Sequence, residues 1–141
     1  METMTDEQRR DFLAVPGRTA ALATTRPDGR PHVVPIWFVS DGDDLLFTTW
    51  RTSVKGRNLA REPRAALTVD DPSFPFAFVV VEGTCTFEDN PPEMLSWATR
   101  IAERYVPAGR AEEFGRRNAV DGELLVRLTP TRVTAQRDIV G

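Results

Sequence analysis

The chain has few of the side chains that carry out chemistry unaided. It has one cysteine, Cys85, and one histidine, His32. A single cysteine excludes an internal disulfide and a cysteine-based metal cluster, and a single histidine excludes a metal site built on imidazoles. A Cys–His nucleophile would need these two residues to meet, and no motif supports such a pair. Cys85 is more simply interpreted as a small packing residue in an alternating strand.

Long apolar runs and nucleotide-binding motifs are missing as well. No run reaches the length of a membrane span, and the polar, acidic segment 1–12 does not have the character of a signal peptide. No glycine-rich dinucleotide fingerprint follows a predicted strand, and no P-loop is present. Because the net charge is -3 and only one element is basic, we do not expect nucleic acid as a partner. We expect a cytoplasmic protein without a membrane partner.

The composition is otherwise ordinary for a globular domain. Apolar residues make up 40% and charged residues 28% of the 141 residues, which fits one domain over 1–141 with a real core. Aspartates cluster at 41–44 and 70–71, but both clusters fall in predicted turns. Solvated carboxylates are therefore a simpler interpretation than a metal site.

Short apolar segments separated by hairpin turns dominate the chain. We predict strands at 19–25, 32–39, 45–50, 64–69, 76–87, and 123–128 with 131–137, the last two forming one strand or a pair. We predict helices at 5–15, 54–61, 90–105 and 111–118. Thr5 and Gln8 fit a capping box, Asn90 a helix cap and Gly83 a bulge. This pattern predicts a mainly β (α+β) fold, an antiparallel barrel with peripheral helices rather than a βαβ array.

A basic segment between two predicted strands departs from the acidic average. Its five cations are Arg51, Lys55, Arg57, Arg61 and Arg64. Only Glu62 opposes them there. Thr52 or Ser53 can cap the helix that begins near Val54, which leaves first-turn N–H groups unpaired. A helix N-terminus with Lys55 in its first turn suits a phosphate. A solvated basic helix is the alternative interpretation.

An earlier predicted strand, HVVPIWFV at 32–39, has Pro35 in its middle. Proline cannot donate to a strand ladder, so this strand is an edge, is bulged, or leaves a gap where something else docks. A planar cofactor with a phosphate arm would fit beside Pro35 and Trp37, with its phosphate at Ser53 to Lys55. Such a cofactor carries the difficult chemistry itself, which agrees with a chain poor in catalytic side chains.

Four stretches carry a resemblance to a known family. They are LATTRPDGRPHVVPIWF (22–38), LLFTT (45–49), VKGRNLAREPRAALTVDD (54–71) and FVVVEGTCTF (78–87). The run K-x-R-N-L-x-x-x-P-R is fairly specific, whereas the hairpin D-G-R-P is weaker alone. Together with the segments that follow, the chain resembles over nearly its whole length the pyridoxamine 5'-phosphate oxidase-like split β-barrels. It resembles most the branch that uses the deazaflavin coenzyme F420.

The resemblance implies a six-stranded antiparallel split β-barrel that forms a homodimer, with two cofactor sites in clefts at the interface. In that family a lysine matching Lys55 holds the cofactor phosphate. The wall that meets the ring system matches Pro35, Ile36, Trp37, Thr48, Thr49 and Trp50. Ser53 and Arg57 fall in the phosphate and tail region, where Arg57 could meet a polyglutamate tail and Arg51 is a further candidate. No catalytic side chain and no metal ligand are implied.

One departure from the family pattern bears on the cofactor. Many flavin-using members carry Ser-Arg-Lys at the phosphate loop, and here the triplet is Ser53-Val54-Lys55. The missing arginine favours coenzyme F420 over flavin mononucleotide (FMN), although nearby arginines could compensate. No C-terminal segment resembles the pyridoxal-binding end of the true oxidases, so we do not expect oxidation of pyridoxamine phosphate.

The predicted function is therefore an F420-dependent oxidoreductase that transfers a hydride to an electron-poor unsaturated small molecule. The alternatives are an FMN-binding oxidoreductase of the same fold and a cofactor-binding module without turnover. The sequence does not choose among quinone-like, enone-like and tetrapyrrole substrates.

Overall fold

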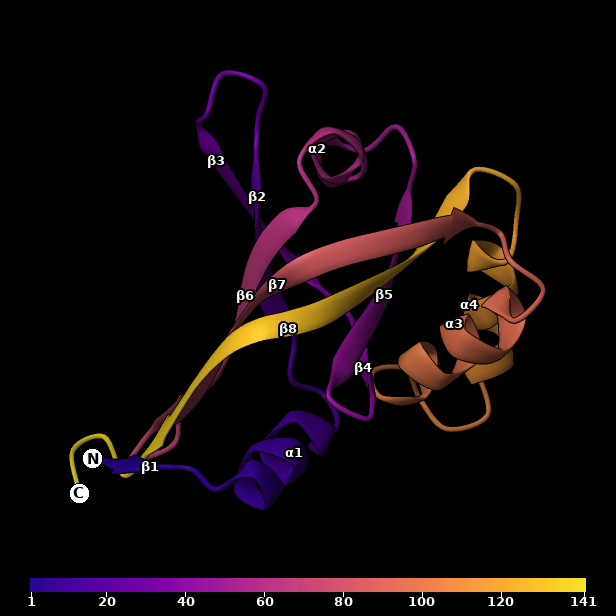
Figure 1. The fold of residues 1–141 in the computed structure, drawn as a ribbon. Helices are drawn as coiled ribbons and strands as arrows, with labels where there is room; N and C mark the ends of the chain where they lie inside the picture. The colour runs from indigo at the N-terminus through magenta and orange to yellow at the C-terminus, as the bar shows by residue number, and fades with distance from the viewer.

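The computed structural model describes residues 1–141 and is built around one antiparallel sheet (Figure 1). The strands are β1 (Glu2–Thr3), β2 (Ala20–Thr25), β3 (Pro31–Ile36), β4 (Val39–Asp41), β5 (Asp44–Trp50), β6 (Arg64–Asp71), β7 (Ala77–Asp89) and β8 (Glu123–Arg137). The helices are α1 (Asp6–Ala14), α2 (Val54–Arg61), α3 (Met94–Glu103) and α4 (Ala111–Asn118). The prediction of a mainly β, antiparallel fold with peripheral helices is confirmed.

The sheet has the strand order β3-β2-β6-β7-β8-β5-β4, and β1 pairs with the far end of β8. It therefore contains eight strands rather than the six that we predicted. The segment 32–39 divides into β3 and β4 at Trp37 and Phe38, and β1 adds a strand of 2 residues. The segments 123–128 and 131–137 form the single strand β8. Pro35 lies in the edge strand β3, where a residue without an N–H is tolerated better than in a central strand.

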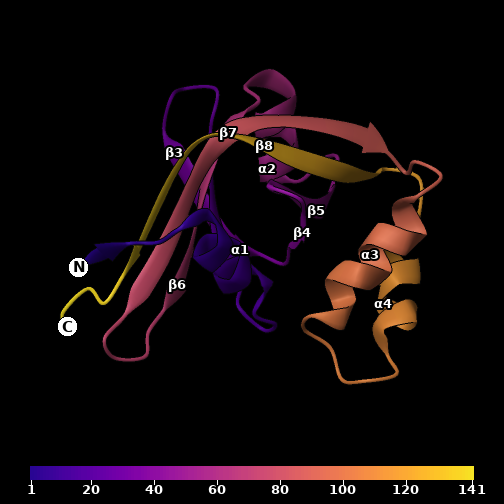
Figure 2. The same cartoon turned by 60° about the horizontal axis from the view of Figure 1, so that its bottom comes forward.

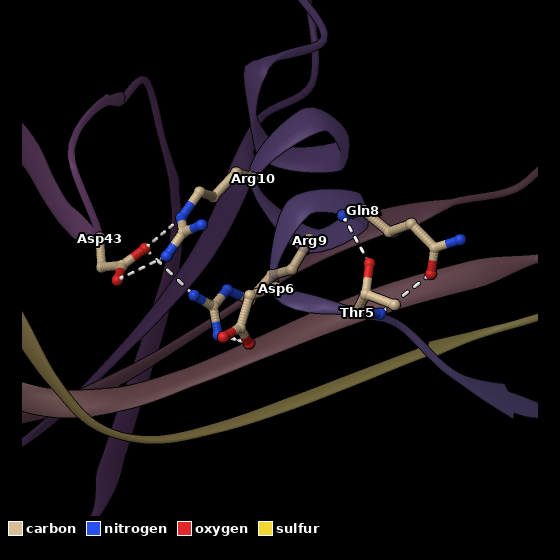
Figure 3. A network of polar contacts seen from close by, with 6 residues as sticks. All are labelled: Thr5, Asp6, Gln8, Arg9, Arg10 and Asp43. Carbon is tan, nitrogen blue, oxygen red and sulfur yellow. Dashed lines mark hydrogen bonds and ion pairs between the residues drawn. The ribbon is translucent and has the colours of Figure 1, made fainter.

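The structure confirms two local predictions, the capping box at Thr5 and the bulge at Gly83. Thr5 caps α1 in a reciprocal capping box with Gln8 (Figure 3). The β7–β8 register shifts between Glu82 and Gly83, which is the predicted bulge. A Cβ at Gly83 would lie 2.2 Å from the carbonyl oxygen of Thr129. Glycine therefore allows the two strands to approach each other at the bulge.

The predicted cap of the third helix is wrong. The helix begins at Met94 with Glu93 as its N-cap, and no side chain caps it. Asn90 has a φ of 37° and donates its N–H to the carbonyl oxygen of Glu123 at 2.9 Å. Side-chain capping typically comes from a residue with an extended backbone, whereas Asn90 is left-handed and follows the end of β7, four residues before the helix begins.

Two apolar clusters pack on opposite faces of the sheet. The larger cluster fills the inside of the curled sheet and includes Leu22, Phe38, Phe47 and Val126. The smaller cluster lies on the outer face, where α3 packs against β5. It consists of Val39, Leu46, Met94, Ile101 and Leu125. Helices α3 and α4 pack side by side at the end of the long β7–β8 ribbon (Figure 2). None of the helices has the length and apolarity to span a membrane.

Candidate functional site

A cavity of about 570 Å³ lies between the β5–α2 connection and the α3–α4 pair. Small-molecule pockets have volumes of about 300–1,000 Å³, so the space suits a cofactor or a substrate of moderate size. Eight of the ten residues predicted for cofactor binding line it: Pro35, Ile36, Trp37, Thr48, Thr49, Trp50, Ser53 and Lys55. These residues come from segments 11 or more positions apart, so the tertiary fold brings the ring wall and the phosphate segment to one place.

The start of α2 forms one end of this cavity. Ser53 is the N-cap, and its Oγ accepts a hydrogen bond from the Gly56 N–H at 3.0 Å. The Thr49 and Ser53 hydroxyls are 2.7 Å apart and share a hydrogen bond that links β5 to the helix cap. The Arg57 N–H donates to the Ser53 carbonyl oxygen at 3.0 Å. The Val54 and Lys55 N–H groups, in contrast, have no hydrogen-bond partner within the chain. They carry the partial positive charge expected at a helix N-terminus.

Gly56 lets the helix start this close to β5. A Cβ at Gly56 would lie 2.7 Å from the Trp50 carbonyl oxygen and 2.9 Å from the Arg51 carbonyl oxygen. Both atoms are backbone, so they cannot turn away as a flexible side chain could. Asn58, which is buried, donates to the Thr24 hydroxyl at 3.0 Å and fixes the same helix to β2. The K-x-R-N-L run thus places its lysine at the cavity and its asparagine in the interior.

Lys55 and Glu123 bring opposite charges into the cavity without pairing directly. Both side chains are half-buried, and neither is part of an ion pair. Burial lowers the pKa of Lys55, against the smaller opposing effect of the Glu123 charge. Burial raises the pKa of Glu123, against the smaller effects of Lys55 and the Thr48 hydroxyl. Desolvation disfavours both charges, and such groups are found more often at functional sites than elsewhere.

The strand register explains how Glu123 reaches this position. Glu123 lies opposite Trp50 in the β5–β8 ladder, so both side chains stand on the outer face of the sheet. Gly122, just before it, has a φ of 92°, and a Cβ there would lie 2.4 Å from the Trp50 ring. The Gly122 N–H donates to an Asp89 carboxylate oxygen at 2.9 Å. Trp50 therefore lies across the glycine turn beside Glu123.

Trp37 forms another part of the wall and stacks on Tyr105 behind it. The Trp37 and Tyr105 rings have centroids 4.9 Å apart and an angle of 9° between their planes. The Tyr105 hydroxyl donates to the Arg18 carbonyl oxygen at 2.8 Å and accepts from the Phe38 N–H at 3.2 Å. These bonds fix Tyr105 and with it the plane of Trp37. A flat ligand would meet a preoriented indole in this part of the cavity.

Sequence reasoning missed the helical wall of the cavity. The residues it did not identify are Ala98, Ile101, Ala102, Phe114, Arg117, Asn118 and Glu123. Ala98, Ile101 and Ala102 recur at helical spacing and are buried, but this spacing does not show what the helix packs against. Glu123 stood at the start of a predicted strand, and no local pattern distinguished it from a solvated carboxylate.

Most of the predicted basic patch lies outside the cavity. Arg51 and Arg57 are exposed and do not line it. Arg61 instead donates to the Thr25 carbonyl oxygen, and Arg64 pairs with Glu62. Of the five cations, only Lys55 lines the cavity. Arg117 from α4 is a second cation there, and it forms no ion pair.

The chain's cysteine and histidine do not contribute to this cavity. Cys85 belongs to the interior cluster, and burial raises the pKa of its thiol to about 12. A thiol in that state is a poor nucleophile at neutral pH. His32 is half-buried on β3 and does not line the cavity. The cavity therefore offers a lysine, a carboxylate, hydroxyls and aromatic rings, and neither a thiolate nor an imidazole.

Comparison with known proteins supports the resemblance seen in the sequence. A protein-family model described as pyridoxamine 5'-phosphate oxidase matches residues 5–137. No curated protein sequence gives a significant match.

Solved structures with the same fold cover most of the chain. The conserved hypothetical protein Rv2991 from Mycobacterium tuberculosis has a TM-score of 0.82 at 24% identity, over 96% of this chain and 88% of that one. A structure described as an F420 reductase has a TM-score of 0.67 at 27% identity, over 87% of this chain and 94% of that one. HutZ, a heme storage protein from Vibrio cholerae, has a TM-score of 0.70 at 17% identity, over 91% of this chain and 92% of that one.

Proposed function

Since this chain belongs to the pyridoxamine 5'-phosphate oxidase family, we propose that its cavity binds the deazaflavin coenzyme F420 and that the protein is an F420-dependent oxidoreductase. The observation that carries the proposal is the meeting of Lys55 and the start of α2 with Pro35, Ile36 and Trp37 in one cavity. The similarity to an F420 reductase supports the same cofactor. The substrate class is an electron-poor unsaturated small molecule.

The residues present fit a ring with an anionic chain. The unpaired N–H groups of Val54 and Lys55, together with the Lys55 ammonium, suit a phosphate. Gly56 keeps the helix start against the β5 turn, so these groups remain at the cavity. The stacked Trp37 provides a flat apolar surface. A half-buried lysine without an ion-pair partner would gain a partner when an anion binds.

Reduced F420 supplies a hydride when it is bound, and the protein need supply only binding and orientation. Lys55 and the α2 amides hold the anionic chain at one end. Trp37, fixed by Tyr105, sets the tilt of a ring that lies against it. Ala98, Ala102 and Phe114 on the helical wall exclude water and leave an apolar surface for a flat acceptor. No side chain in this scheme forms a covalent bond to substrate.

FMN is the alternative cofactor, because Arg117 at the cavity provides a second cation for a phosphate. Haem is less well supported. Haem iron takes an axial histidine, cysteine, methionine or tyrosine. His32 and Cys85 do not line the cavity, and the Tyr105 hydroxyl is already hydrogen-bonded. The likeness to HutZ, at 17% identity, concerns the fold.

Fluorescence titration of the purified protein with F420 and with FMN tests the cofactor. We expect micromolar or tighter binding of F420 and weaker binding of FMN. Binding of neither at micromolar concentration would contradict both cofactor assignments, and tighter binding of FMN would favour the alternative. Turnover of reduced F420 with a panel of quinones and enones then distinguishes an enzyme from a binding module, which would bind the coenzyme without consuming it.

We also propose that the protein works as a homodimer. Exposed apolar side chains available for a two-fold contact include Phe74 and Phe76 beside β7 and Leu95 on α3. A two-fold axis would use the same patch on both subunits. Sedimentation velocity should give a dimer, and Phe76→Asp or Leu95→Asp should shift it to the monomer. A wild-type monomer would remove the shared-cleft arrangement but leave the cavity within one chain.

A further inference from the structure

The cavity contains a carboxylate whose role the cofactor proposal leaves open. Glu123 lines the same space as Lys55, from the opposite strand β8, and it forms no ion pair. The Thr48 hydroxyl, which lines the same cavity, lowers the pKa of Glu123, but by less than burial raises it. A carboxylate in a cavity meant only for an anion would weaken binding by repulsion. Glu123 is therefore compatible with ligand binding at this cavity if the ligand also carries a group that can donate a hydrogen bond to it.

The other charged groups around the cavity do not satisfy Glu123. Arg117 comes from α4 and contacts the Phe114 ring, with its guanidinium carbon 5.2 Å from the ring centroid. Asp89 from β7 is held by the Gly122 N–H, and Arg51 points to solvent from the turn before α2. Lys55 influences Glu123 only through space. The carboxylate is therefore half-buried in the cavity without an ion-pair partner, so a donor on a ligand could bind to it.

We propose that Glu123 is a specificity-determining residue that accepts a hydrogen bond from a hydroxyl or N–H group lying next to the anionic group held at Lys55. This inference rests on the proposed function of the cavity. Lys55 and Glu123 together select ligands in which an anion and a hydrogen-bond donor are neighbours, as in a polyhydroxylated chain that ends in a phosphate. F420 and FMN both carry such a chain.

The same pair discriminates against ligands that carry anionic groups without a neighbouring donor. A haem has two carboxylates and no such donor beside them. One carboxylate at Lys55 would face Glu123 across the cavity, and like charges held close together disfavour binding. Glu123 thereby separates the two ligand classes that proteins of this fold are described as using, flavin-type cofactors and haem.

The test compares F420, FMN and hemin binding to wild type, Glu123→Ala and Glu123→Gln. Glu88→Gln is the matched control, since Glu88 is an exposed carboxylate on β7 that does not line this cavity. Thermal melting of each variant shows whether it is folded. We expect Glu123→Ala to weaken F420 and FMN binding about tenfold, the loss of one hydrogen bond to a charged group. Hemin binding should stay the same or tighten.

Glu123→Gln keeps an acceptor oxygen but loses the charge. It should therefore bind F420 and FMN more tightly than Glu123→Ala does, and it should not exclude hemin. Glu88→Gln should change none of the three affinities. Unchanged or tighter F420 and FMN binding in Glu123→Ala would overturn the inference, and so would equal weakening of all three ligands. If wild type binds neither F420 nor FMN, the proposed function itself is wrong and the inference with it. Binding by wild type with no effect of Glu123→Ala leaves the proposed function standing.

Discussion

Two cavities of nearly equal size in this molecule differ in whether the charged residues that line them form ion pairs. The cavity beside α1 has a volume of about 580 Å³ and is lined by Arg9, Arg10 and Asp43. The cavity beside α2 has a volume of about 570 Å³ and is lined by Lys55 and Glu123. Volume alone therefore does not indicate which one is built to hold a ligand.

The charges beside α1 are matched to each other. Asp43 accepts from Arg10 Nε at 2.9 Å and from Arg9 Nη2 at 3.1 Å (Figure 3). The hydrogen bond from Arg10 lowers the pKa of Asp43 below its ordinary value. The interaction ties α1 to the turn between β4 and β5. It is a structural contact on the surface, where such pairs contribute about 0–1 kcal/mol to stability.

The charges beside α2 are left unmatched. Burial lowers the pKa of Lys55 and raises the pKa of Glu123, so both shifts favour the neutral forms. No arginine is among the groups that offset the effect of burial on Glu123. Eleven of the 21 acidic residues form ion pairs with arginines, whereas Lys55 and Glu123 share a cavity and form none. The difference teaches that half-buried charges without an ion-pair partner, more than the volume of a cavity, identify the candidate binding site.

The largest expected effect is the loss of F420 affinity when Lys55 is replaced, compared with the replacement of a cation in the other cavity. Lys55→Ala should weaken F420 binding about 10- to 100-fold, because it removes a charge-assisted hydrogen bond worth about 1.5–3 kcal/mol. Arg10→Ala is the matched control and should leave F420 affinity unchanged. Fluorescence titration measures both. Equal F420 affinities of wild type and Lys55→Ala would show that Lys55 does not bind the phosphate.

The second effect tests how closely α2 approaches β5. Gly56→Ala puts a methyl group against the Trp50 and Arg51 carbonyl oxygens, which should lower the free energy of unfolding by about 1–3 kcal/mol. Helix propensity alone predicts the opposite sign, a gain of up to about 1 kcal/mol. Urea denaturation of the variant decides between the two. Stabilisation would mean that the close approach does not constrain this position.

The smallest effect is on the pH dependence of stability. Asp43 has a folded pKa below its ordinary value of 3.8, so its contribution is present above that pH and is lost as the pH falls through the folded pKa. Asp43→Asn should therefore lower the Tm by about 1–4 °C at pH 7, and the difference from wild type should shrink as the pH falls below 3.8 and through the folded pKa.

Glu123 should show the reverse dependence. Its folded pKa lies above the ordinary value of 4.5, so the folded state favours its protonated form and loses stability as the pH rises through that pKa. Glu123→Gln should match wild type near pH 4 and melt at a higher temperature at pH 8. Scanning calorimetry of both variants at three pH values makes the comparison. Parallel pH profiles would show that the folded state favours the ionised form of Glu123, as it does that of Asp43, and would contradict this prediction.

The sequence by itself determined the β5–α2–β6 segment, because its signals are local. Ser53 caps the helix through the Gly56 N–H three residues later, and Pro63 follows its last turn. Strand alternation in 76–87 and the bulge at Gly83 are local in the same sense. The position of Lys55 in the first turn of a capped helix needed no knowledge of the rest of the chain.

Only the tertiary structure decided what faces Lys55. The β5–β8 register sets Glu123 opposite Trp50, although the two residues are far apart in sequence. Packing of α3 against the outer face of β5, and of α4 against α3, brings Phe114 and Arg117 to the same cavity. A single sequence carries no local signal for strand register over such distances, since the register depends on which side chains share a face after folding.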